Sequence, residues 1–208
     1  MKFLNSDVTL CLGAHPDDVE YGMAGTFSCC SQTKFIVLVM SSGGDFDQTT
    51  IESNRREENL DVWSLFGNVS GEVIDGFVKD QSEDSMVNLI EKKYLLGVDT
   101  VLIPPMIDSH FEHRIINKLG PALCRRLPLN LIEYRTPSTL NNWIPNYFVN
   151  LNEKQYNLKK IALKKFVSQQ KAPYFADKTL DSFHHNFQCS KKGYEIVESY
   201  KIVESFLK

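Results

Sequence analysis

Short runs of apolar, often β-branched residues recur along the chain, and they limit the possible folds more than any other feature of the sequence. The clearest runs cover residues 8–14 (VTLCLGA), 35–40 (FIVLVM) and 100–103 (TVLI). Residues 129–134 (LNLIEY) repeat the pattern more weakly. Such runs are typical of strands that are buried on both faces, as in a parallel sheet covered by helices on each side.

Helix-length stretches separate these runs. The predicted helices cover residues 18–31, 52–66, 83–96, 112–126 and 153–170. Asn152 and Gln155 have the spacing of a capping box, which predicts the start of the last helix. From residue 172 the pattern blurs, and we expect a long loop before a closing element near 193–206. The alternation of strands and helices predicts an α/β fold with a mostly parallel sheet, in a single domain spanning residues 1–208.

The composition excludes several classes of protein. With 42% hydrophobic and 24% charged residues, the chain is near the globular average, which excludes disordered and collagen-like proteins. A net charge of −3 gives no reason to expect nucleic acid or an anionic membrane surface as a partner. Five cysteines without paired spacing indicate reduced thiols. Because neither a signal peptide nor a membrane-spanning window is apparent, we expect a cytoplasmic protein.

The first polar cluster, residues 13–18 (GAHPDD), directly follows the first predicted strand. Ligands of open α/β sheets bind beyond the carboxyl ends of the strands, so the position favours a functional loop. The loop lacks the glycines of a dinucleotide-binding loop and the Gly-Lys-Ser/Thr of a P-loop. A helix start accounts for Pro16 and one aspartate, but not for His15 or the second aspartate. One imidazole and two carboxylates within four residues are therefore candidate metal ligands.

The second cluster, residues 104–114 (PPMIDSHFEHR), follows the run at 100–103. Because the carboxyl ends of parallel strands lie at one edge of a sheet, His110 and His113 are expected near His15. Surface or capping histidines are the plainer interpretation, but two such clusters at strand ends favour a metal site. A His/Asp/His set leaves a fourth position for water, as in hydrolytic zinc sites. Zinc lowers the pKa of bound water from 15.7 to about 7, and a neighbouring carboxylate can accept the proton.

Other candidates are weaker. Residues 54–58 (NRREE) open a predicted helix, where a solvated charged face is the usual explanation and an Arg55 near a polar substrate is the sharper one. Tyr134, at a strand end, is a candidate for the wall of a cleft. His184 and His185 are more typical of a surface loop than of a substrate site.

Four motifs together resemble those of the LmbE-like/PIG-L de-N-acetylases, zinc enzymes that remove the acetyl group from N-acetylglucosamine units of glycoconjugates. The similar family elements are A-H-P-D-D, T-x-G-E/D, R-x-x-E followed by L-G, and H-x-D-H-R. Their counterparts here are residues 13–18 (GAHPDD), 42–45 (SGGD), 55–58 (RREE) with 66–67 (FG), and 110–114 (HFEHR). The later stretch 134–151, followed by a Lys-rich helix that ends at residues 169–170, also looks like the later portion of the family. Four ordered motifs across residues 8–170 are far more specific than any single one.

This resemblance implies a Rossmann-like α/β fold, with a mostly parallel sheet flanked by helices. It implies that zinc is held by His15, Asp18 and His113, with Fe²⁺ as a possible substitute since such ligands accept several divalent ions. Asp17 would be the general base that deprotonates the zinc-bound water. His110 would stabilise the tetrahedral intermediate or protonate the leaving amine, and the sequence leaves open whether Asp17 or His110 delivers that proton.

The resemblance also implies how a substrate is bound. Arg55 matches a family arginine that contacts the sugar or its substituent, and Asp45 and Tyr134 are further candidates for substrate binding. The expected enzyme is a zinc-dependent N-deacetylase, a hydrolase of linear amides. Its expected partner is a small-molecule acetamido sugar, an N-acetylglucosamine-type glycoconjugate or a nucleotide-linked sugar. The sequence is compatible with a homo-oligomer.

One departure from the family pattern concerns Glu112, which stands where the family often has aspartate between the two histidines. Ser109 and Glu112 have the spacing of a capping box. This spacing predicts that Glu112 mainly caps the following helix and leaves His110 less firmly oriented.

Two alternatives remain open at the level of sequence. A metal-dependent phosphoesterase would use the same carboxylate-rich edge, but it would want a second metal and a further acidic cluster. A non-catalytic sugar-binding domain with a vestigial site is the other alternative. The intact residues His15, Asp17, Asp18 and His113 argue against decay of the site.

Overall fold

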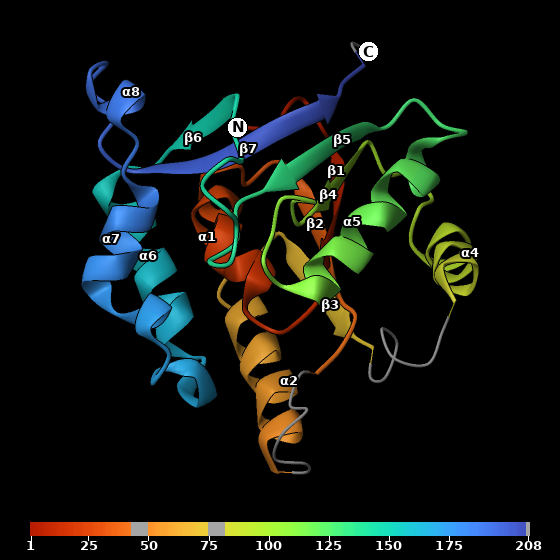
Figure 1. Cartoon of the computed structure of the whole chain (residues 1–208), viewed down its shortest axis with the longest axis horizontal. Coiled ribbons are helices and arrows are strands. Elements are labelled where there is room, and N and C mark those ends of the chain that lie inside the picture. Colours follow the sequence, from red (N-terminus) through yellow and green to blue (C-terminus); the bar gives the residue numbers. More distant parts are fainter. Residues whose placement is uncertain (43–49, 75–81, 207–208) are drawn as a thin grey trace.

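The computed structural model describes residues 1–42, 50–74 and 82–206. Its centre is a seven-stranded sheet with the strand order β3-β2-β1-β4-β5-β7-β6 (Figure 1). The strands are β1 Val8–Gly13, β2 Lys34–Val39, β3 Val69–Val73, β4 Thr100–Ile103, β5 Asn130–Tyr134, β6 Tyr147–Asn150 and β7 Val197–Glu204. The first five are parallel, and β7 runs antiparallel to both β5 and β6. The predicted α/β fold with a mostly parallel sheet is therefore confirmed.

Helices cover both faces of this sheet. They are α1 Asp18–Cys29, α2 Thr50–Trp63, α4 Glu83–Lys93, α5 Phe111–Cys124, α6 Glu153–Lys164, α7 Asp177–His184 and α8 Phe187–Ser190. The predicted capping box is present at the start of α6, where the Asn152 side chain accepts the Gln155 N–H at 2.9 Å. The prediction of a long loop after residue 172 is wrong, because this stretch contains α7 and α8. No helix in the described ranges is both long and apolar enough to cross a membrane.

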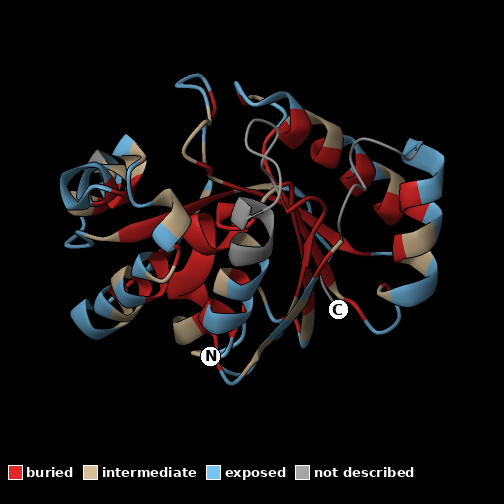
Figure 2. Ribbon diagram, turned by 90° about the horizontal axis from the view of Figure 1, so that it is seen from below, coloured by how far each residue is buried: buried red, intermediate tan, exposed pale blue. Residues whose placement is uncertain are grey.

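Successive side chains of the central strands enter two separate cores, as a sheet buried on both faces requires. In β1, Leu10 and Leu12 pack on one side with α4 and α5, whereas Cys11 packs on the other with α1. In β4, Val101 joins the first of these cores and Leu102 the second. Figure 2 shows the resulting buried sheet between layers of helices that are exposed on their outer sides.

The chain reverses its direction of travel across the sheet between β1 and β4. From β1 it continues to β2 and β3 on one side, and later from β4 to β5 on the other. The connections that leave the carboxyl ends of these two neighbouring strands therefore diverge and leave a crevice. Such a switch point is where ligands bind in open α/β sheets.

Candidate active site

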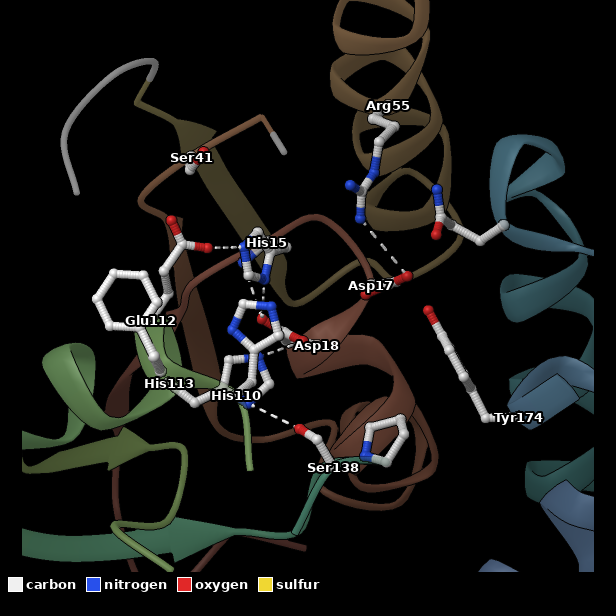
Figure 3. A pocket seen from close by; sticks show the side chains of 13 residues that line it. His15, Asp17, Asp18, Ser41, Arg55, His110, Glu112, His113, Ser138 and Tyr174 are labelled. Carbon is white, nitrogen blue, oxygen red and sulfur yellow. Dashed lines mark hydrogen bonds and ion pairs between the residues drawn. The ribbon is translucent and has the colours of Figure 1, made fainter. Parts of the chain in front are cut away.

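A cavity of about 530 Å³ lies at this switch point. The loop after β1 contributes His15, Asp17 and Asp18, and the loop and helix start after β4 contribute His110 and His113. The structure thus brings together the two clusters that the sequence places after separate strands (Figure 3).

Asp18 connects the two clusters. Its Oδ2 accepts the backbone N–H groups of Ala14 at 3.1 Å and of His15 at 2.8 Å, which fixes the carboxylate at the start of α1. Its Oδ1 lies 3.1 Å from Nε2 of His113, and its Oδ2 lies 3.5 Å from Nδ1 of His15. A single buried carboxylate therefore faces one imidazole from each loop.

His113 is oriented from behind by Asp108. Nδ1 of His113 lies 3.1 Å from Oδ2 of Asp108 and 3.2 Å from Oγ of Ser138. Asp108 itself accepts the Thr136 hydroxyl at 2.5 Å and the backbone N–H of His110 at 2.7 Å. A carboxylate at Nδ1 favours a ring proton there, so that Nε2 is the nitrogen that would be available to a metal ion, as in many metal-binding histidines.

Glu112 contacts His15 instead of capping the helix. α5 begins at Phe111 with His110 at its N-cap and no side-chain cap, and the Ser109 hydroxyl donates to the Ser138 carbonyl. The Glu112 carboxylate forms a short contact with Nε2 of His15. The predicted capping role of Glu112 is therefore wrong: its carboxylate orients a cluster histidine, because the helix starts one residue later than the capping spacing requires.

His110 completes a group of three imidazoles. Its ring centroid lies 4.7 Å from that of His15 and 4.8 Å from that of His113. Each of the three rings offers a nitrogen within 4.8 Å of the others. His110 is exposed whereas His113 is buried, so His110 faces the open part of the cavity.

Burial and the surrounding carboxylates have opposite effects on the pKa values of the two less exposed imidazoles, His15 and His113. Burial alone lowers the pKa of His15, but hydrogen bonds with Asp18 and Glu112 outweigh it and raise the pKa to about 9. Burial likewise lowers the pKa of His113, but the charge of Asp18 and the hydrogen bond with Asp108 raise it to about 10. The carboxylates around the cluster thus favour positive charge within it.

Asp17 is held in a strained position. Its φ of 99° lies in the left-handed region, which residues other than glycine seldom adopt. The side chain is buried, and its Oδ2 has no hydrogen-bond partner in the part of the chain that the structure describes. Burial, and then the charge of Asp18, raise the pKa of this carboxyl to about 8. Such outliers collect at functional sites, where the surrounding structure enforces them.

Arg55 approaches Asp17 from α2. Its Nη2 donates to the Pro16 carbonyl at 2.9 Å and lies 3.7 Å from Oδ2 of Asp17. The guanidinium therefore lies at the wall of the cavity, beside Oδ2 of Asp17 (Figure 3).

Other predicted residues lie elsewhere. Tyr134 is fully buried and donates to the Leu12 carbonyl at 2.9 Å, so it packs in the core and does not line the cavity. His184 is buried in α7, and His185 borders a separate surface pocket. Asp45 lies outside the described residues.

Comparison with known proteins finds deacetylases among the chains that this protein resembles. No protein-family model matches the chain. A protein of Escherichia coli (strain K12), the uncharacterized deacetylase YaiS, is 26% identical over 169 residues, which cover 76% of this chain and 90% of that protein. The N,N'-diacetylchitobiose deacetylase of Pyrococcus horikoshii superimposes with a TM-score of 0.74 at 21% identity, covering 96% of this chain and 84% of that chain. The resemblance to the LmbE-like/PIG-L family is confirmed.

A similar fold also occurs with a different chemistry. GalB, the 4-carboxy-2-hydroxymuconate hydratase of Pseudomonas putida KT2440, superimposes with a TM-score of 0.77 at 14% identity, covering 100% of this chain and 98% of that chain. At such identities the likeness concerns the fold alone. The reaction must therefore be argued from the side chains of the site.

Four residues of this site have no role in the sequence-based expectations: Asp108, Ser138, Gln169 and Tyr174. Asp108 could have been found, since it precedes His110 by two residues directly after a predicted strand. Gln169 lies at the end of the last predicted helix and Tyr174 follows that helix, and no local pattern connects them with loops more than 50 residues away.

The donor set fits a divalent cation. Imidazole nitrogens and carboxylate oxygens are the ligands that zinc takes in catalytic sites, and Asp18 already lies within 3.5 Å of two imidazoles. The second nitrogens of His15 and His113 meet Glu112 and Asp108, the outer contacts that orient metal ligands. The described residues contain one cluster of this kind.

Proposed function

We propose that the protein is a metal-dependent hydrolase that removes the N-acetyl group from an acetamido sugar. The observation that carries this proposal is the position of Asp17, whose buried Oδ2 has no hydrogen bond within the described residues and lies in the same cavity as the His15, Asp18 and His113 donors. A hydrolytic site needs both a cation-binding set and a separate base. The likeness to YaiS and to the chitobiose deacetylase supports the acetamido substrate.

His15, Asp18 and His113 are the residues that would hold the metal ion, zinc in the first place and Fe²⁺ as the alternative. His110 could replace Asp18 as the third ligand by its distance from the other rings. Asp18 is the better choice because it lies within 3.5 Å of both inner imidazoles, whereas His110 is exposed. A bound ion of this type polarises a carbonyl oxygen and makes water more acidic.

The remaining residues have separate roles in amide hydrolysis. Oδ2 of Asp17 accepts a proton from the attacking water, since it lies in the cavity and carries no other hydrogen bond within the described residues. The exposed ring of His110 stabilises the oxyanion that develops on the acetamido carbonyl, or protonates the leaving nitrogen. Arg55 orients the Asp17 carboxylate and lies where a sugar substituent would enter.

A phosphoesterase is less well supported. Two-metal phosphoesterases hold their ions about 3.5–4 Å apart, which requires additional bridging acids. Among the residues that the structure describes, the cavity carries one cluster of three imidazoles, and its carboxylates, Asp17, Asp18 and Glu112, already contact Arg55 or these imidazoles.

The first experiment measures metal content together with acetate release. We expect about one tightly held zinc ion per chain, lost in His113→Ala, and metal-dependent acetate release from N-acetylglucosamine or its β-1,4-linked dimer. His185→Ala is the matched control, because His185 is exposed and outside the cavity. Two metal ions per chain would favour the phosphoesterase. Bound zinc without acetate release from any acetamido sugar would contradict the deacetylase and point to another hydrolytic or hydratase reaction.

A further inference from the structure

The wall of the cavity that faces the histidines comes from the segment after α6. This segment, residues 166–175, includes two short 3-10 turns, Val167–Gln169 and Pro173–Phe175. Gln169 and Tyr174 both line the cavity. Figure 3 shows Tyr174 on the side opposite His110 and His113, with its hydroxyl end directed towards Asp17.

The segment is fixed to the two helices that carry the site. The Glu58 carboxylate on α2 accepts the backbone N–H of Ser168 at 2.9 Å and its hydroxyl at 2.6 Å. Arg55 lies one helical turn before Glu58, so the same helix contacts Asp17 and positions the opposite wall. The R-x-x-E spacing on α2 therefore places Arg55 beside Asp17, the proposed base, and Glu58 beside segment 166–175.

Tyr174 is held from behind by other aromatic rings. Its carbonyl accepts the Tyr21 hydroxyl at 2.7 Å, and the Tyr21 ring meets the Tyr174 ring edge-on, with centroids 5.8 Å apart and planes at 76°. Phe175 packs beside it at 5.0 Å. The Tyr174 side chain remains half-buried, and among the described residues its hydroxyl has no hydrogen-bond partner. A ring supported on one side and open on the other is a preformed contact surface.

We propose that Tyr174 is the surface on which the sugar ring of the substrate rests, and that Gln169 hydrogen-bonds the hydroxyl groups at the edge of that ring. This proposal rests on the proposed deacetylase function and specifies its substrate-binding wall. A hexose ring has an apolar face of C–H groups and a polar rim, which match an aromatic ring beside an amide. Arg55 is the single Lys or Arg among the described lining residues, so the wall fits a neutral sugar better than a nucleotide diphosphate.

The proposal is tested with Tyr174→Ala, Tyr174→Phe and Gln169→Ala in the zinc-loaded protein. Removing the ring removes contacts made equally in the ground state and the transition state, which raises KM and leaves kcat nearly unchanged. We expect KM for the N-acetylglucosamine dimer to rise about tenfold in Tyr174→Ala, which corresponds to about 1.4 kcal/mol. Tyr174→Phe, which keeps the ring, should stay within about threefold of the original KM, and Gln169→Ala should fall between the two.

Tyr194→Ala is the matched control, because Tyr194 is exposed and does not line the cavity. A second readout avoids turnover: saturation-transfer NMR of N-acetylglucosamine with the metal-free protein, where Tyr174→Ala should lose the signal and Tyr174→Phe keep it. Thermal unfolding of each variant separates lost binding from lost folding, and Tyr174→Phe remains informative if Tyr174→Ala unfolds.

The outcomes separate this proposal from the proposed function. Acetate release with the same KM and the same NMR signal in folded Tyr174→Ala would overturn the sugar-binding wall alone. Tyr174-dependent sugar binding without acetate release would keep the wall and overturn the deacetylase. Tight binding of a nucleotide-linked sugar that is insensitive to Tyr174 would overturn the preference for a neutral sugar. Absence of both binding and hydrolysis for every sugar would overturn both proposals.

Discussion

Two clusters of buried charges contact α1, one at its start and one further along it, and they are built in opposite ways. Further along the helix, the Glu198 carboxylate is surrounded by donors. Lys159 forms an ion pair with it, and the backbone N–H groups of Gly25 and Thr26 donate to it at 2.9 and 2.6 Å. At the start of the helix, Asp17 is also buried, but its Oδ2 lacks a hydrogen bond within the described residues.

The difference separates a structural cluster from a functional one. Buried polar atoms normally have partners, because an unsatisfied one costs about 1–3 kcal/mol. At Asp17 this cost coincides with left-handed backbone and with the like charge of Asp18. Folding alone gives no reason to keep such a group, whereas a proton acceptor needs a lone pair that faces the cavity. The contrast between the two carboxylates is therefore an argument about function that can be tested by mutation.

Asp17→Asn should have the largest effect on activity. We expect kcat for acetate release to fall about 10²- to 10⁴-fold, the usual contribution of a general base. The free energy of unfolding should stay the same or rise, because asparagine carries no like charge beside Asp18 and tolerates the left-handed region. Acetate release by the zinc-loaded variant and thermal unfolding measure the two quantities.

Asp177→Asn, at the exposed start of α7, is the matched control and should leave both quantities unchanged. If Asp17→Asn kept more than a tenth of the original turnover, Asp17 would not be the proton acceptor. A large loss of stability in the variant would instead place Asp17 with the structural cluster.

Lys159→Met should have the converse effect to Asp17→Asn: it should lower stability and leave the metal site unchanged. Removing one partner of a buried ion pair leaves the other charge uncompensated and typically costs about 3–5 kcal/mol. We therefore expect the free energy of unfolding to fall by about that amount in urea denaturation, while the zinc content of the folded fraction is unchanged.

Lys164→Met changes an exposed lysine of the same helix and should alter stability by less than about 0.5 kcal/mol. The double variant Lys159→Met/Glu198→Gln should recover part of the loss, since an uncharged amide no longer needs the ammonium group. Equal stability of Lys159→Met and Lys164→Met would show that the Glu198 cluster does not stabilise the fold.

Much of the fold follows from patterns that are local in sequence. The runs at 8–14 and 35–40 are apolar on both faces because their strands lie in the middle of the sheet. By contrast, β3 and β6 were not predicted. β3 has the burial pattern of an edge strand, with exposed Ser70 and Glu72, and β6 is four residues long. Strands at the edges of a sheet carry a weaker hydrophobic signal than central ones.

The residues of the site likewise fall into those that local sequence patterns predict and those that depend on long-range contacts. His15, Asp17, Asp18, His110 and His113 could be predicted because strand ends and the fold class together determine that their loops meet. The long-range contacts could not. Lys159 belongs to a stretch of lysines typical of a solvated face, and its burial depends on Glu198, 39 residues later. Tyr174 enters the cavity only because Glu58 and Tyr21 fix its segment.

The smallest expected effect concerns His184, which should alter how the free energy of unfolding depends on pH. The side chain is 1% exposed in α7, with Nδ1 2.8 Å from the Leu180 carbonyl and Nε2 unpaired within the described residues. Burial, and then the positive charge of Lys159, hold the pKa of His184 well below its usual value. Arg135 and Lys160 add to this effect, and the Tyr156 ring packs against it at 5.4 Å.

His184 should therefore destabilise the folded state in acid. Below the ordinary histidine pKa of about 6.5 the unfolded chain binds a proton that the folded chain does not, so stability is complete above that pH and falls as the pH decreases. The loss approaches about 1.4 kcal/mol per pH unit for this one group.

In urea denaturation between pH 7 and pH 5, His184→Asn should show a shallower decline in the free energy of unfolding than the original protein, whatever its stability at pH 7. Exposed His185→Asn should keep the original slope. Identical slopes for all three proteins would mean that His184 is protonated in the folded chain. In that case Glu198 would compensate the positive charge of Lys159 so completely that Lys159 would have no electrostatic effect on His184.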